Sequence, residues 1–93
     1  MLFSKHALLK IEEREIGKSL IEKVIEKPDF LFYDIITKSM VAIGKVEMAR
    51  TETYLVIPFV KEGEQIKVVT IYPCKNIEKE INKKEAKRWI KIR

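Results

Sequence analysis

The chain begins with two stretches whose apolar side chains recur at the spacing of an α-helix. Over residues 4–16, Ser4 stands where an N-cap residue belongs. One side of this predicted helix carries apolar residues: Ala7, Leu8 and Ile11. A second stripe runs over residues 20–25 and stops before Pro28, because the residue before a proline avoids the α region. The sequence therefore predicts two short antiparallel helices with a tight join.

The start of the second helix has two interpretations. Gly17 interrupts the first helical pattern and can itself be the N-cap of the next helix. Alternatively, Ser19 and Glu22 fit a capping box of the form S-x-x-E, in which each side chain bonds a backbone N–H of the first turn. Both interpretations leave the apolar stripe of this helix facing a core.

After the second helix the apolar period changes to two, as is typical of β-strands. Aromatic and β-branched residues predict a strand over 30–35, and an alternating pattern predicts the next over 40–48. Two further strands are expected over 53–60 and 65–72, with a hairpin turn at 61–64.

Single residues within these strands carry positional information. Gly44 indicates a bulge or a close approach of another backbone. Pro58 removes one ladder donor, so it marks an edge position or a strand end. The last predicted strand is apolar on both faces at Val68 and Val69, which is typical of a central strand, and Pro73 is expected to end it.

A final helix is predicted after Asn76, which can serve as its N-cap. Ile77, Ile81 and Trp89 would share one face of this helix, although Glu85 interrupts the stripe. The element order predicts an α+β fold in which two N-terminal helices pack on a four-stranded antiparallel sheet, plus a C-terminal helix. The length of 93 residues suits a single domain covering residues 1–93.

The net charge of +5 comes from one end of the chain. Residues 1–74 contain 11 basic and 11 acidic side chains, whereas residues 75–93 contain 8 basic and 3 acidic ones, a surplus of five. This local surplus indicates a polyanionic partner such as RNA. The cations expected to bind nucleic acid lie on the outer side of the predicted C-terminal helix: Lys83, Lys84, Lys87 and Arg88.

Several classes of protein are disfavoured by composition. One histidine and one cysteine, Cys74, provide neither a disulfide nor a metal-ligand cluster, and three isolated glycines make no phosphate loop, so no metal or cofactor is expected. No apolar run approaches the ~20 residues of a membrane span, and no signal peptide is evident, so we expect a cytoplasmic protein without a membrane partner. Abundant Lys, Glu and Ile are typical of thermophile proteins. The oligomeric state is left open.

The first predicted helix carries an unusual charged stripe. His6, Lys10 and Arg14 follow one another at intervals of four residues, so all three project from one face. Basic groups in a first turn oppose the helix dipole, and breaks of such local rules cluster at functional sites. The alternative is a solvated face whose charges are balanced from elsewhere in the fold.

The same stretch resembles a known group of sequences. His6, Ala7, Ile11, Arg14 and Ile16 match the opening H-A-x-x-R-[apolar]-x-x-R-x-I of small prokaryotic proteins that are similar to BrnT-type toxins and, more distantly, to the RelE/ParE toxin superfamily. Two positions depart from this pattern, where Lys10 replaces the first Arg and Glu15 replaces a Gly. The likeness continues through residues 25–29 and the late strand at 68–72, which includes Thr70 and Tyr72.

This resemblance implies a RelE/ParE-like fold and a toxin that cleaves mRNA without a metal, held in check by a cognate antitoxin protein. A base would remove the proton of the ribose 2′-hydroxyl, and cations would stabilise the phosphorane that follows. We expect His6 near a helix N-terminus to be a neutral ring that acts as the base, and Arg14 and Lys10 to hold the phosphate. Arg50 lies where BrnT-like chains tend to carry a basic residue, which makes it a third candidate catalytic residue.

Two classes of function follow. The first is a metal-independent endoribonuclease with His6, Arg14 and Arg50 at its site. The second is a binding module of the same fold that recognises protein or nucleic acid without catalysis, which Lys10 in place of Arg and the lack of a second clear acid or base favour.

Overall fold

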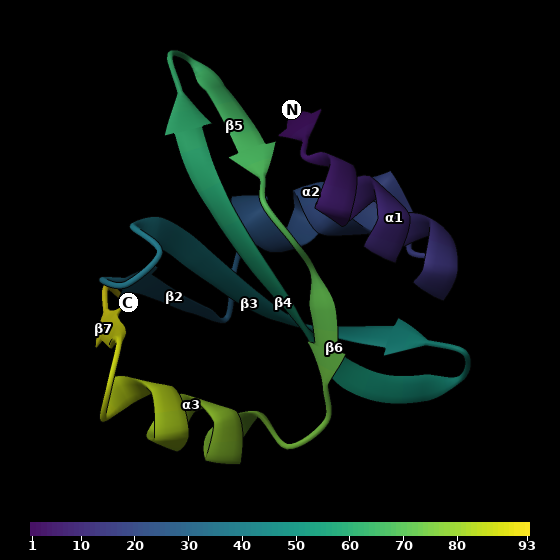
Figure 1. Cartoon of the computed structure of the whole chain (residues 1–93). Coiled ribbons are helices and arrows are strands. Elements are labelled where there is room, and N and C mark those ends of the chain that lie inside the picture. Colours follow the sequence, from purple (N-terminus) through teal and green to yellow (C-terminus); the bar gives the residue numbers. More distant parts are fainter.

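The computed structural model describes residues 1–93 as three helices and a curved sheet (Figure 1). The elements in chain order are β1 (Leu2–Phe3), α1 (Lys5–Arg14), α2 (Lys18–Glu26), β2 (Phe30–Asp34), β3 (Ser39–Met48), β4 (Thr51–Glu62), β5 (Gln65–Val68), β6 (Tyr72–Cys74), α3 (Ile77–Glu85) and β7 (Trp89–Lys91). The predicted α+β class is confirmed, and the N-terminal helices pack on the sheet. No helix is both long and apolar enough to cross a bilayer.

Both N-terminal helices begin as backbone physics requires. The predicted N-cap of α1 is confirmed, because the hydroxyl of Ser4 accepts a hydrogen bond of 3.0 Å from the backbone N–H of Ala7. α2 begins after Gly17, which caps it without a side-chain bond. The capping box at Ser19 is wrong, because Ser19 already lies inside the first turn of α2.

α1 ends at Glu15 in a conformation that suits glycine. Its φ of 52° and ψ of 48° are left-handed, which costs an L-residue about 1–2 kcal/mol. The Gly at this position in the resembling sequences has no such cost. We therefore expect Glu15→Gly to raise the free energy of unfolding by roughly 0.5–1 kcal/mol in urea denaturation. Glu12→Gly, inside the helix, should lower it by about as much, and a loss of stability in Glu15→Gly would contradict this explanation.

The sheet contains seven strands, not the four predicted, and it is mixed. Its order is β1-β5-β4-β3-β2-β7, with β6 also paired to β4. Neighbouring strands are antiparallel except β1, which runs parallel to β5. The strands at the two edges of the sheet, β1 and β7, were not predicted. They have two and three residues, which is too short to show the alternation of apolar and polar residues that marks a strand.

The single strand predicted over 65–72 is in fact two strands. β5 and β6 pair with different parts of β4, and the chain leaves the sheet between them, so Val69 is exposed rather than central. Pro73 does not end the strand, because it lies within β6 opposite Leu55.

Pro58 does not end a strand, because it lies in the middle of β4, but on one side of β4 it lies at a local gap in the sheet. Its carbonyl accepts a hydrogen bond of 2.9 Å from the N–H of Val69, so the position of its missing N–H also faces the break between β5 and β6. The proline therefore removes a donor where no strand is available to receive it.

The C-terminal helix is shorter than predicted. Asn76 caps α3 through a 3.2 Å bond from the N–H of Lys79, and this prediction is confirmed. The helix ends at Glu85, and Trp89 begins β7, so the predicted helical face shared by Ile77, Ile81 and Trp89 is wrong. Ile77 and Trp89 still share a core, because β7 returns the indole to the same face of the sheet.

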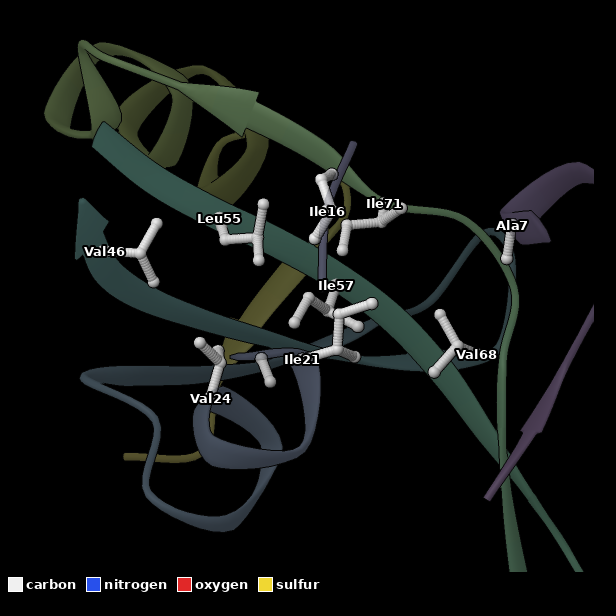
Figure 2. Packing of buried hydrophobic residues seen from close by; sticks show 10 residues of the cluster. Ala7, Ile16, Ile21, Val24, Val46, Leu55, Ile57, Val68 and Ile71 are labelled. Carbon is white, nitrogen blue, oxygen red and sulfur yellow. The ribbon is translucent and has the colours of Figure 1, made fainter. Parts of the chain in front are cut away.

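Two cores lie on opposite faces of the sheet. The first lies under α1 and α2, where Figure 2 shows Ile21 and Val24 of α2 facing side chains of β3 and β4. The second lies under α3 and contains Phe32, Ile77 and Trp89. Alternate residues of β3 serve each core: Ala42 and Val46 serve the first, and Val41 and Ile43 the second. The sheet is therefore buried on both faces at its centre.

Candidate functional site

A hollow of about 180 Å³ lies between α3, the turn after β2 and the break between β5 and β6. Seven of its eleven lining residues carry polar or charged side chains. The lining residues are Asp34, Thr37, Ser39, Val41, Pro58, Val69, Thr70, Tyr72, Lys84, Arg88 and Trp89. Polar groups that converge on a cavity make a default binding-site hypothesis.

The buried carboxylate of Asp34 organises this hollow. Its Oδ1 accepts bonds from the backbone N–H groups of Ile36 at 2.9 Å and Thr37 at 3.1 Å. Its Oδ2 accepts bonds from Nε of Arg88 at 2.8 Å and Nε1 of Trp89 at 3.2 Å. Burial alone would raise the pKa of Asp34, but the bonds from Thr37, Arg88 and Ile36 outweigh it and hold the pKa below its ordinary value. Asp34 is therefore an anion with every bond committed.

Arg88 is held by one end and free at the other. Nε is bound to Asp34, and the two terminal Nη groups have no hydrogen-bond partner in the chain. Its side chain is 26% exposed, so these donors border the hollow without being sealed from water. A guanidinium fixed in this way offers two parallel N–H groups, which match two oxygens of a phosphate or carboxylate.

Lys84 provides a second cation beside Arg88. Its Nζ lies 3.8 Å from a carboxylate oxygen of Glu80 and 5.7 Å from the centre of the Trp89 ring. Both contacts position the ammonium near the wall of the hollow without satisfying all three of its donors.

Tyr72 completes the wall as a fixed donor. Its hydroxyl donates a hydrogen bond of 2.8 Å to Glu80. Burial raises the pKa of the Tyr72 phenol far above its ordinary value, and the bond to Glu80 and its negative charge raise it further. Tyr72 therefore remains protonated, and its proton holds Glu80 in place, which in turn orients Lys84.

The volume of the hollow limits its ligand. It equals the share of about six water molecules and is smaller than the ~300–1,000 Å³ of typical small-molecule pockets. A phosphate-sized group fits this space better than a whole nucleotide does. No three His, Cys, Asp or Glu side chains gather as metal ligands anywhere in the chain.

The charged stripe of α1 lies outside this hollow. His6 and Arg14 are exposed, whereas Lys10 is half-buried and lies 3.9 Å from Glu13. At 1.5 Å of rise per residue, His6 and Arg14 are separated by about 12 Å along the helix axis. Side chains that share a face at this distance do not meet at one reacting atom.

Arg14 lies in a second hollow, of about 340 Å³, which also includes Glu47, Met48 and Ala49. Arg50 is exposed at the tip of the β3–β4 hairpin, next to Ala49. The structure thus brings Arg14 and the hairpin that carries Arg50 to the end of the molecule away from His6.

The start of α1, two residues before His6, contacts the wall of the first hollow. The hydroxyl of Ser4 donates a bond of 2.6 Å to the carbonyl of Val69, and the N–H of Ser4 bonds that of Val68 at 2.9 Å. Val69 lines the hollow, so α1 begins against its back wall.

The structure unites some sequence-predicted residues and separates others. Lys84 and Arg88 join Thr70 and Tyr72 in the first hollow, whereas Lys83 and Lys87 are exposed outside it. Sequence reasoning missed Asp34. A carboxylate that ends an aromatic, β-branched strand is a rare residue in a rare place, and this could have identified it.

Comparison with known proteins gives one match. A family model described as Domain of unknown function (DUF4258) matches residues 3–81, which include Asp34, Thr70, Tyr72 and Glu80 but end before Lys84. No curated protein matches the chain, and no solved structure matches it.

Proposed function

The chain belongs to the DUF4258 family, and on that premise we propose that it is the toxin-like member of a toxin–antitoxin pair, a metal-independent endoribonuclease acting on mRNA. The observation that carries this proposal is the hollow in which Arg88, fixed by buried Asp34, stands beside Lys84. The RelE/ParE-like resemblance supports it, because two N-terminal helices packed on a mainly antiparallel sheet are the arrangement that this resemblance implies.

In this proposal the hollow holds the scissile phosphate. The two Nη groups of Arg88 donate to its non-bridging oxygens, and Lys84 adds a positive charge as the phosphorane develops. Asp34 keeps the guanidinium in one orientation, so little reorganisation is needed during the reaction. The exposed cations Lys83 and Lys87 extend this basic surface along the RNA.

Proton transfer needs a base, and no residue lining the hollow has a free one. His6, on α1 outside the hollow, is the proposed base: bound RNA would have to bring its 2′-hydroxyl to this ring, which would take the proton as the 2′-oxygen attacks phosphorus. The 5′-oxygen would then leave with a proton from solvent, which yields a cyclic phosphate and a 5′-hydroxyl. Arg14, Arg50 and Lys10 would bind RNA phosphates on either side of the cleaved one.

One observation favours the second function, a binding module without catalysis. His6 makes no hydrogen bond to the chain, so nothing sets which of its ring nitrogens carries the proton. A hollow that only binds phosphate needs no base, and Lys84 and Arg88 suffice for it.

The test uses the purified chain and RNA in the presence of a chelator. Lys84→Ala should weaken RNA affinity about tenfold and lower the salt dependence by roughly one counterion, because one phosphate contact is lost. Lys23→Ala, which removes the same charge from an exposed site on α2, should change affinity less than about twofold. Equal losses in the two variants would refute the hollow as the RNA site.

Cleavage itself separates the two functions. His6→Ala should abolish cleavage and leave RNA affinity unchanged if the chain is an endoribonuclease. If the unmodified chain leaves RNA intact and its expression does not slow growth, the endoribonuclease function is refuted and the binding module is the remaining function.

A further inference from the structure

Half of the sheet face that carries the N-terminal helices is bare. α2 packs on β3 and β4, and no helix packs on that face of β2 or β7 (Figure 1). Trp89 of β7 points to the opposite face, into the core under α3, so its neighbour Ile90 points to the bare side.

Apolar side chains cross this bare face in rows. Residues opposite one another in neighbouring strands share a face, so the strand register defines each row. One row runs from the edge strand to the core under the helices: Ile90, Tyr33, Met40, Phe59 and Val68. A second row runs through Leu31, Ala42 and Ile57, and Ile92 joins it by a 2.8 Å bond from its N–H to the carbonyl of Leu31.

Each row passes from buried to exposed without becoming polar. Val68 and Ile57 are fully buried, whereas Ile90 is 53% and Ile92 is 51% exposed. The core under α2 therefore continues to the sheet edge as an apolar strip that lacks a cover.

The strip has the width of one helix. Helices in one layer pack about 8–10 Å apart, which is about two strand spacings of 4.8 Å. Because α2 covers β3 and β4, the next place in its layer lies over β2 and β7. We propose that an acidic amphipathic helix of a partner protein docks on this bare face, beside α2.

The charges around the bare face indicate that the docking helix carries negative charge. The segments that form and border the face, residues 30–41 and 86–93, contain one carboxylate, Asp34, which is buried and bound to Arg88. Their remaining charges are all positive. Lys91 pairs with Phe32 and, like Arg93 by alternation, projects to the α3 face, which leaves Lys38 and Lys87 in the turns that border the bare face and Lys61 on β4 two residues beyond Phe59. These cations attract an acidic rim around an apolar stripe.

The same charges disfavour a second copy of this chain as the occupant. A second copy of this chain would bring one basic rim against another. The proposal that a helix docks here does not depend on RNA cleavage, so it can be correct whether or not the chain is an endoribonuclease.

The test measures binding of a designed helix of leucine and glutamate about five turns long, with a leucine and lysine counterpart as the control peptide. Fluorescence anisotropy should show affinity at least about tenfold higher for the acidic peptide. Ile90→Asp should weaken this binding about tenfold, whereas Leu9→Asp, at a side chain 55% exposed on α1, should leave it unchanged. Methyl NMR should show shifts at Ile90, Ile92 and Leu31.

Several results would overturn the proposal. They are equal binding of the two peptides, no binding at millimolar peptide, equal loss in both variants, a dimer that Ile90→Asp disperses, and RNA affinity that Ile90→Asp lowers. Thermal unfolding checks that Ile90→Asp remains folded. Ile92→Asp, beyond the last residue of β7, repeats the test where the sheet tolerates a charge, and the same peptide results are expected from it.

Discussion

Asp34→Ala is expected to lower the free energy of unfolding by about 3–5 kcal/mol, because it removes one partner of a buried ion pair and leaves three further donors unpaired. Arg88, Trp89 and two backbone N–H groups all bond this carboxylate, whose side chain is 7% exposed. These bonds attach β7 and the turn after β2 to one point. Chemical denaturation measures the loss, and RNA affinity should fall with it, since Arg88 would no longer be held.

Asp29→Ala is the matched control. Asp29 also accepts a backbone bond, from the N–H of Lys45 at 2.7 Å, but its residue is exposed. Water can replace that bond, so Asp29→Ala should lower the free energy of unfolding by only about 1 kcal/mol. Asp34→Asn should fall between the two, because it keeps an acceptor and loses the charge. If Asp34→Ala costs no more than Asp29→Ala, Asp34 does not organise the hollow.

The same carboxylate predicts how stability depends on pH. The folded-state pKa of Asp34 lies below the ordinary value of 3.8, so its ionised form stabilises the fold. This stabilisation is fully present above pH 3.8 and is lost as the pH falls through the lower folded pKa. Acid unfolding of Asp34→Asn should therefore show a weaker dependence on pH in this range than that of the unmodified chain.

Local sequence signals predicted local structure well. The Ser4 cap, the Asn76 cap and the hairpin turn at Gly63, whose φ is 64°, each depend on residues within three positions. Strand pairing was harder to predict from the sequence, because it depends on segments that are far apart in the chain. β7 is three residues long, and only its partner β2, more than fifty residues away in the chain, makes it a strand.

The candidate site shows the same division. The basic surplus at the end of the chain predicted Lys84 and Arg88 as binding residues, and both line the hollow, but charge alone could not show that Asp34 fixes one of them. The spacing of His6 and Arg14 on one helix face suggested a single site, whereas the rise of the helix keeps the two about 12 Å apart. Periodicity gives direction around a helix and says little about distance along it.

Gly44 was expected to mark a bulge or a close approach of another backbone, whereas the structure shows the close approach of a side chain, that of Val24. The register of β3 with β4 continues unbroken through Gly44, so no bulge exists. A Cβ at this position would lie 2.8 and 2.9 Å from the two methyl groups of Val24 in α2. α2 can therefore rest on β3 only because position 44 has no side chain, and this contact places α2 over the first core.

Gly44→Ala is accordingly expected to lower the free energy of unfolding by about 1–3 kcal/mol through overpacking, although alanine loses less backbone entropy on folding than glycine. Val24→Ala alone should also destabilise, because it leaves a cavity. Together the two should cost less than their sum by about 0.5–3 kcal/mol, since the new methyl group occupies the space that valine leaves. Gly44→Ala with Val41→Ala, a buried valine on the other face of β3, should instead add within about 0.5 kcal/mol. Urea denaturation of the five variants measures both couplings, and equal coupling in the two pairs would mean that the Gly44–Val24 contact does not set the position of α2.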